Sequence, residues 1–100
     1  MPKLEISVRH RLPRDEAIRR IKSLLVDLEE EHGDNIAKMQ EAWSGNIGQF
    51  SFEAMGFAVS GTLEVTSSEV KLNGQLPFAA SFFKGRIESA IRERAQRLLT

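Results

Sequence analysis

The chain opens with a strict alternation of apolar and polar residues over positions 3–9. Leu4, Ile6 and Val8 share one side, and charged or hydroxyl side chains occupy the other. Because successive side chains of a β-strand point to opposite faces, this pattern predicts a half-buried strand. Pro13 follows the strand and suits the first turn of a helix, where its missing N–H would have no partner anyway.

The spacing of apolar residues then changes to three and four, which predicts an amphipathic helix at about 13–32. Acidic residues in its first turn suit the positive end of the helix dipole. Gly33 is placed to cap its C-terminus in a left-handed conformation. The apolar stripe consists of Ala17, Ile18, Ile21, Leu24, Leu25 and Leu28.

Residues 34–76 predict a meander of four short strands separated by turn residues. The strand at about 37–43 is the least clear, because its composition also suits a helix. The strand at 57–65 alternates most regularly, and Gly61 falls on its inner face. Gly74 takes the same place in the last strand. Both glycines predict a close approach of another backbone or helix, or a bend in the sheet.

A second amphipathic helix is predicted at about 80–99, after Pro77 ends the meander. Ser81 is a candidate for its N-cap. Gly85, in the early part of this helix, costs about 1 kcal/mol relative to alanine. That cost suggests either close packing against the sheet or a flexible first turn.

These elements predict a single α+β domain over residues 1–100, with the order β-α-β-β-β-β-α. Hairpin connections make the last four strands antiparallel, and the first strand joins the last one at an edge. The result is an antiparallel sheet of about five strands in the order 1-5-4-3-2, with both helices on one face. At the level of architecture this resembles the helix-grip proteins, which bind apolar ligands.

Charge is distributed unevenly, although the net charge is zero. Residues 1–22 carry a net charge of +4, residues 23–83 of −7, and residues 84–100 of +3. One interpretation is solvated helix faces whose fields partly cancel. The other is a basic surface, formed where the helices meet, that binds an anionic partner. The candidate anion-binding residues are Arg9, Arg11, Arg14, Arg86 and Arg92.

The residue types that support catalysis or metal binding are few and dispersed. Cysteine is absent, and His10 and His32 each end a predicted element, where structural roles suffice. The serines form no nucleophile elbow, and the acidic run that ends the first helix is typical of a solvated surface. Glu41 shares strand parity with Trp43, but an edge position suits it better than a role as a buried acid. We therefore expect no enzyme, no metal and no cofactor.

Two other classes of protein are also disfavoured. The longest apolar run is far short of the ~20 residues that a membrane helix needs, and the alternating, charged start does not resemble a signal peptide. A net charge of zero argues against nucleic-acid binding. We therefore expect a cytoplasmic protein without a membrane span.

The aromatic side chains are the most distinctive feature of the composition, because all of them lie at or beyond position 43. The segment 78–83 is apolar almost all round, so one sheet cannot bury every face of it. It forms a buried helix start, the floor of an apolar groove, or a contact with a partner. The candidate apolar contact or ligand residues are Trp43, Phe50, Phe52, Phe78, Phe82 and Phe83.

Several short motifs resemble the polyhydroxyalkanoic acid system family of small bacterial proteins. They cover nearly the whole chain, and the opening strand and helix fit the start of that family. The resemblance implies a place near storage-polyester metabolism, and it implies no reaction and no catalytic residues. The motifs are Trp43-Ser44-Gly45, Phe50-Ser51-Phe52, Gly56, Val59–Val65 with Val70, and Leu76 followed by Phe83–Glu88 and Ile91.

Three hypotheses about function follow. The first is a non-enzymatic accessory or binding protein of polyhydroxyalkanoate storage, which contacts a polyester granule surface or a granule protein through segment 78–83. The second is a small helix-grip carrier of an apolar or acyl ligand, with a closed cavity lined by Trp43, Phe50 and Phe52. The third is an anion-binding module that uses the basic helix faces. A homodimer that hides an apolar patch is left open.

Overall fold

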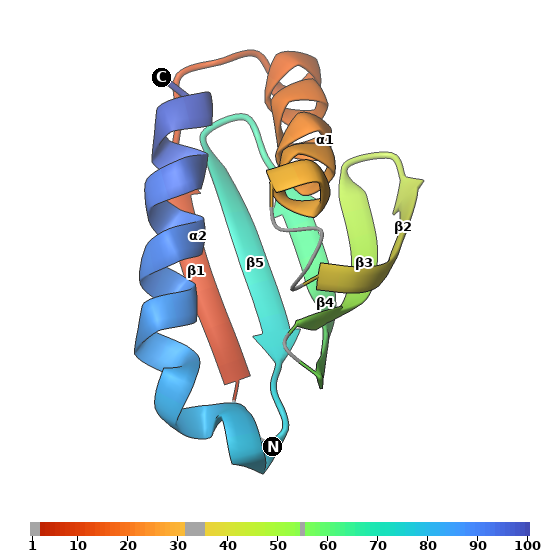
Figure 1. The fold of residues 1–100 in the computed structure, drawn as a ribbon. Helices are drawn as coiled ribbons and strands as arrows, with labels where there is room; N and C mark the ends of the chain where they lie inside the picture. The colour runs from red at the N-terminus through yellow and green to blue at the C-terminus, as the bar shows by residue number, and fades with distance from the viewer. Residues whose placement is uncertain (1–2, 32–35, 55) are drawn as a thin grey trace.

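The fold is a five-stranded antiparallel sheet with two helices on one face (Figure 1). The computed structural model describes residues 3–31, 36–54 and 56–100. The predicted α+β class and the order β-α-β-β-β-β-α are confirmed. The elements are β1 (Lys3–Arg9), α1 (Arg14–Glu31), β2 (Ile36–Ser44), β3 (Ile47–Ala54), β4 (Phe57–Val65), β5 (Glu69–Gln75), the 3₁₀ helix η1 (Phe78–Phe83) and α2 (Lys84–Leu98).

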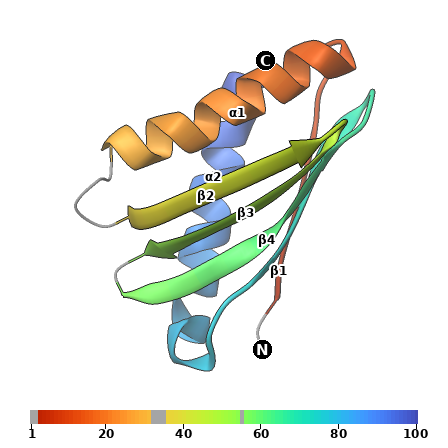
Figure 2. The ribbon, with the colours of Figure 1, turned by 90° about the vertical axis from the view of Figure 1, so that its right-hand side faces the viewer.

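The strands lie in the predicted order, β1-β5-β4-β3-β2. Their register aligns the apolar positions on the helix-covered face: Ile6 lies opposite Leu72, and Leu72 lies opposite Leu63. A shift of one residue would turn each strand's apolar side toward solvent, so the alternating pattern fixes this register. Both helices of the described residues lie on the same side of the sheet, which leaves its opposite face open (Figures 1 and 2).

The two helices cover different parts of the sheet. α2 lies along β1, and α1 runs beside β2 (Figures 1 and 2). Ala17 and Ile21 of α1 are almost completely buried, as is Leu76 just after β5. Burying such a side chain stabilises the fold by roughly 1.5–3 kcal/mol for the larger residues. Ala17, Ile21, Leu24 and Leu25 of α1 and Ala95 of α2 therefore form one core with the inner face of the sheet.

The C-terminal helix differs from its prediction at its start. Residues 78–83 form a 3₁₀ turn, and the α-helix begins only at Lys84. Ser81 does not cap the helix with its side chain, but its backbone carbonyl accepts the Lys84 N–H. A Cβ at Gly85 would meet no atom within 4 Å, so the close packing considered for this glycine is wrong. The predicted cap at Gly33 and the role of His32 lie outside the described residues.

The glycine pair in the middle of the sheet confirms the predicted close approach. Gly61 and Gly74 lie opposite each other on β4 and β5. A Cβ at Gly61 would lie 2.3 Å from the carbonyl oxygen of Asn73, far inside van der Waals contact. Phe50 faces Gly61 from β3 and is only 6% exposed. The missing side chains thus let two backbones come together beside a large buried ring.

Candidate functional site

The 3₁₀ helix η1 exposes two phenylalanines at one end of the molecule. It follows β5 at the end opposite the C-terminus (Figure 1). The side chain of Ala80 is buried against the core, whereas Phe78 is 74% and Phe82 is 76% exposed. The tight turn directs one small residue inward and leaves the large apolar residues around it in solvent. The predicted contact segment therefore forms a projection from the protein rather than a buried helix start.

Phe83 belongs to the same projection, next to Phe82 at the end of η1. It is partly buried, and its ring centroid lies 4.2 Å from that of Phe82, with the rings tilted by 37°. Such a tilted aromatic pair holds both rings in a defined arrangement. We call Phe78, Phe82 and Phe83 the aromatic tip. Only two other large apolar side chains among the described residues, Val26 and Ile47, are classed as exposed.

The other three aromatic candidates do not belong to the aromatic tip. Phe50 is buried in the core and stacks on Phe52, with ring centroids 6.0 Å apart. Trp43 lies on the edge strand β2, and its indole ring packs against Gly48. A Cβ added at Gly48 would lie 2.7 Å from that ring. Lys22 of α1 places its Nζ 5.3 Å from the centroid of the Trp43 ring. The six residues are thus divided among a tip, a core and an edge.

The five candidate anion-binding arginines are also divided. Arg9, Arg11 and Arg14 lie where β1 leads into α1, at the end of the molecule where α2 finishes (Figure 1). Arg86 lies in the first turn of α2, at the other end of that helix, and Arg92 lies near the middle of it. A helix of fifteen residues is about 22 Å long, so these groups cannot contact one small anion together.

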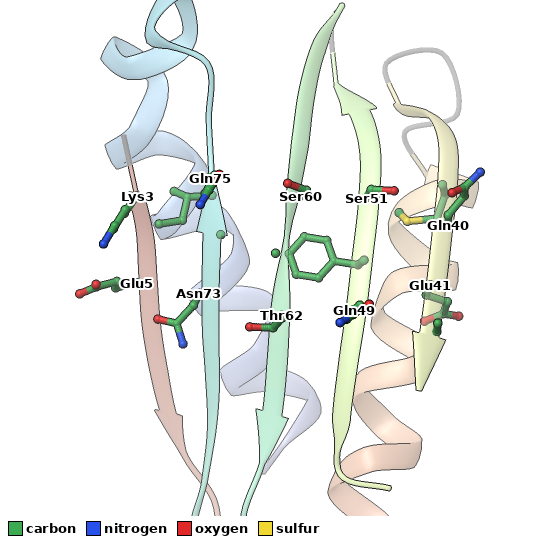
Figure 3. A pocket seen from close by; sticks show the side chains of 16 residues that line it. Lys3, Glu5, Gln40, Glu41, Gln49, Ser51, Ser60, Thr62, Asn73 and Gln75 are labelled. Carbon is green, nitrogen blue, oxygen red and sulfur yellow. The ribbon is translucent and has the colours of Figure 1, made fainter. Parts of the chain in front are cut away.

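A shallow hollow of about 1100 Å³ lies on the open face of the sheet. Figure 3 shows hydroxyl and amide side chains from β2, β3, β4 and β5 along it, with Lys3 and Glu5 of β1 at one side. Alternation in the sequence placed these residues in solvent but gave no reason to group them across strands. In the described part of the chain, no cluster of three His, Cys, Asp or Glu side chains could hold a metal ion.

Among the described residues, His10 is the polar residue that is buried, with 7% of its surface exposed. Its Nδ1 accepts the backbone N–H of Leu12 at 3.1 Å, and its Nε2 lies 3.0 Å from the carbonyl oxygen of Thr66. A backbone N–H can only donate, so Nδ1 carries no proton and Nε2 donates to Thr66. The sequence analysis predicted a structural role for His10. Its hydrogen bond to Thr66 connects the end of β1 to the turn between β4 and β5.

Arg20 joins the two helices, which the sequence did not predict. Its guanidinium donates to the carbonyl oxygens of Leu98 and Thr100, both at 3.0 Å, and its Nε donates to Glu16 at 2.9 Å. Arg19 also donates to the Glu16 carboxylate. These two arginines, Arg19 first, lower the pKa of Glu16 below its usual 4.5. A cation beside the final carbonyls of a helix also suits the helix dipole.

Acidification should weaken this link between the helices. A carboxylate with a lowered pKa in the folded state stabilises the fold above its unfolded pKa, and that contribution disappears as the pH falls through the folded pKa. We expect Glu16→Gln to lower the thermal midpoint at about pH 7, and the difference from the wild type to be smaller at about pH 3. Thermal melts monitored by circular dichroism at both pH values measure this. Glu93→Gln, which removes an ion pair within α2, serves as the control, and an equal pH dependence in all three proteins would contradict the expectation.

The fold and its exposed groups define a class of protein: a small α+β domain with an aromatic tip and an open polar sheet face, in which the described residues form no cluster of three metal-ligating side chains. Residues 4–99 match the family model described as "Putative polyhydroxyalkanoic acid system protein". The chain therefore belongs to the polyhydroxyalkanoic acid system family, as its motifs indicated.

Other comparisons add little. No functionally curated protein matches the chain. The crystal structure of TTHA0849 from Thermus thermophilus aligns with 98% of this chain and 92% of its own, at 14% identity and a TM-score of 0.43. This likeness is too distant to bear on function. Neither helix within the described residues has the length and apolar character needed to cross a bilayer.

Proposed function

We propose that this protein is a non-enzymatic accessory protein of polyhydroxyalkanoate storage, and that it contacts the polyester surface in the cytoplasm through the aromatic tip. The observation that carries the proposal is the exposure of Phe78 and Phe82, at 74% and 76%. Two large apolar side chains held in solvent by one short turn are typical of a contact surface. Membership of the polyhydroxyalkanoic acid system family supports polyester as the surface that the aromatic tip contacts.

The expected strength of such a contact is modest. Burying one phenylalanine side chain contributes roughly 1.5–3 kcal/mol, so two of them supply about 3–6 kcal/mol before the entropy of association is subtracted. Before that subtraction, a free energy of this size corresponds to dissociation constants of about 40 μM to 6 mM, so the net contact of one molecule is weaker still. A granule surface presents many equivalent positions, so even this weak contact concentrates the protein there.

The test is sedimentation with particles of amorphous poly(3-hydroxybutyrate) that carry no protein. We expect the wild-type protein to sediment with the particles, and Phe78→Asp and Phe82→Asp each to weaken this binding by at least about tenfold. Both residues are exposed, so the thermal midpoint should not change. Binding that survives in both variants would exclude the aromatic tip as the contact.

The matched control is Ile47→Asp, which removes an exposed apolar side chain (46% exposed) from the open sheet face. This variant should bind the particles as the wild type does. Wild-type binding to granules that retain their proteins, but not to bare particles, would contradict direct polyester contact and favour a granule protein as the partner.

A further inference from the structure

The strand β2 ends the sheet with one edge unpaired. None of its nine residues is buried, whereas each of the other strands contributes buried residues. In Figure 3, α1 lies behind β2 on the helix-covered side. β2 is the last strand of the sheet order, and Figure 1 shows no described element beyond its outer edge. An unpaired edge presents a row of backbone N–H and C=O groups to any strand that can match them.

Only part of this edge is regular. Lys38 has a φ of 57°, and the pairing with β3 shifts register between Ala37 and Gln40. A bulge with a lysine is a common device that prevents a strand from joining an edge. The segment Gln40–Ser44 keeps a continuous register with β3 and carries a single charged residue, Glu41.

The direction of the backbone groups in this segment follows from its neighbours. The carbonyl of Asn46 accepts a backbone hydrogen bond from β4 at 2.9 Å. Since backbone groups alternate sides along a strand, Ile47 directs its own groups toward β2, where it faces Ser44. The same alternation along β2 leaves Glu41 and Trp43 with their N–H and C=O groups directed to the free edge.

We propose that Gln40–Ser44 pairs antiparallel with the same segment of a second copy of this chain, about a two-fold axis at Ala42. Glu41 of each copy then lies opposite Trp43 of the other, and these two pairs exchange four backbone hydrogen bonds. The two sheets become one continuous ten-stranded sheet with the helices of both copies on the same face. This inference does not depend on the proposed function.

Two-fold axes at the neighbouring residues Glu41 and Trp43 give less favourable strand pairs. An axis at Glu41 places two carboxylates directly opposite each other, which is destabilising across a strand pair. An axis at Trp43 pairs Glu41 with Gly45, which lies in the turn beyond the strand and cannot continue the ladder. Only the axis at Ala42 pairs both outward-facing residues within the strand.

The side chains are also self-complementary in this register. Within one chain, the Trp43 indole N–H donates to the Glu41 carboxylate at 3.2 Å, and Lys22 lies over the indole ring. Across the axis, each Glu41 carboxylate faces the other copy's Trp43 and the lysine above it. A negatively charged carboxylate therefore meets the Lys22 cation of the other copy. On the open face, Ala42 meets Ala42, and a methyl group allows close approach.

The first test is a cross-link, which is simple to read because the chain contains no cysteine. In the proposed pair, the two Ala42 residues form a non-hydrogen-bonded pair with Cα atoms about 4.5 Å apart, within the range of a disulfide. Ala42→Cys should form a covalent dimer under mild oxidation. Ala37→Cys, exposed on the same strand, would place its two sulfurs about 33 Å apart and should stay monomeric. Equal cross-linking of both variants, or none of either, overturns the proposal.

The second test is sedimentation equilibrium of the whole chain over a range of concentrations. The wild type should dimerise with increasing concentration, and Glu41→Lys should weaken dimerisation by at least about tenfold, because it places a lysine opposite Lys22 of the other copy. Adding Lys22→Glu to Glu41→Lys should restore dimerisation. Glu5→Lys makes the same charge change on β1, the other edge strand, and should leave dimerisation intact. A wild type that is monomeric throughout, or a dimer broken only by Glu5→Lys, would exclude this interface.

Discussion

Gly61→Val is expected to lower the free energy of unfolding by about 3 kcal/mol, at the upper end of the usual cost of overpacking a core. A Cβ at this position would lie 2.3 Å from the Asn73 carbonyl oxygen and 2.7 Å from the Cα of Gly74. Both atoms belong to the backbone of β5, so neither can move aside as a flexible side chain would. The strand pair must separate, and this disrupts the centre of the sheet.

Two other glycines provide graded controls for this prediction. A Cβ at Gly74 would lie 3.2 Å from the Ser60 carbonyl oxygen, so Gly74→Ala should cost less than Gly61→Ala. Gly85→Ala should raise stability by about 0.5–1 kcal/mol, because nothing lies within 4 Å and alanine favours a helix. Urea denaturation measures all of these changes. A Gly61→Val protein as stable as the wild type would disprove the backbone contact.

His10→Phe is expected to lower the free energy of unfolding by about 2–4 kcal/mol, although phenylalanine is apolar and His10 lies in the core. The substitution leaves the Leu12 N–H and the Thr66 carbonyl without the partners that the imidazole provides. Each buried polar group that loses its partner costs roughly 1–3 kcal/mol. Loss of the link between the β1–α1 connection and the β4–β5 turn is the main physical effect.

His10→Asn separates the two hydrogen bonds. An asparagine oxygen can accept the N–H of the residue two positions ahead, as in an Asx-turn, so the bond to Leu12 is retained and only that to Thr66 is lost. Its unfolding free energy, from urea denaturation, should lie between those of the wild type and His10→Phe. If both variants matched the wild type, the imidazole hydrogen bonds would have no role in stability.

Segment 78–83 shows a feature that the sequence could not decide, namely which of its side chains are exposed. The apolar character of residues 78–83 was evident from the sequence, but three outcomes were consistent with it. The direction of Phe78 and Phe82 depends on the 3₁₀ turn that follows Pro77, and on Ala80 taking the buried position. A continuous α-helix from residue 80, as predicted, would distribute these side chains differently. The exposed aromatic tip is therefore a result of tertiary packing.

Contacts between distant segments could not be predicted from the sequence either. Arg20 appeared there as one of the charged residues on the polar face of a helix, yet it donates to carbonyl oxygens 78 and 80 positions further along the chain. No periodicity encodes such a contact, because it depends on how α1 and α2 lie against each other. The separation of the five predicted anion-binding arginines has the same cause, since the length of α2 lies between Arg86 and the three arginines at the β1–α1 end; anion binding itself stays a prediction.

The sequence by itself determined the strands, the helices, which side of each faces the core, and the antiparallel order of the sheet. These follow from local periods of two and of three to four residues, from turn residues and from short connections, which act within a few positions along the chain. Only the tertiary structure decided the exposure of the aromatic tip, the hydrogen bonds of His10 and Arg20, and the bulge at Lys38 that interrupts the edge strand. Each of these depends on which distant backbone or side chain occupies the neighbouring space, and packing determines that for the whole chain at once.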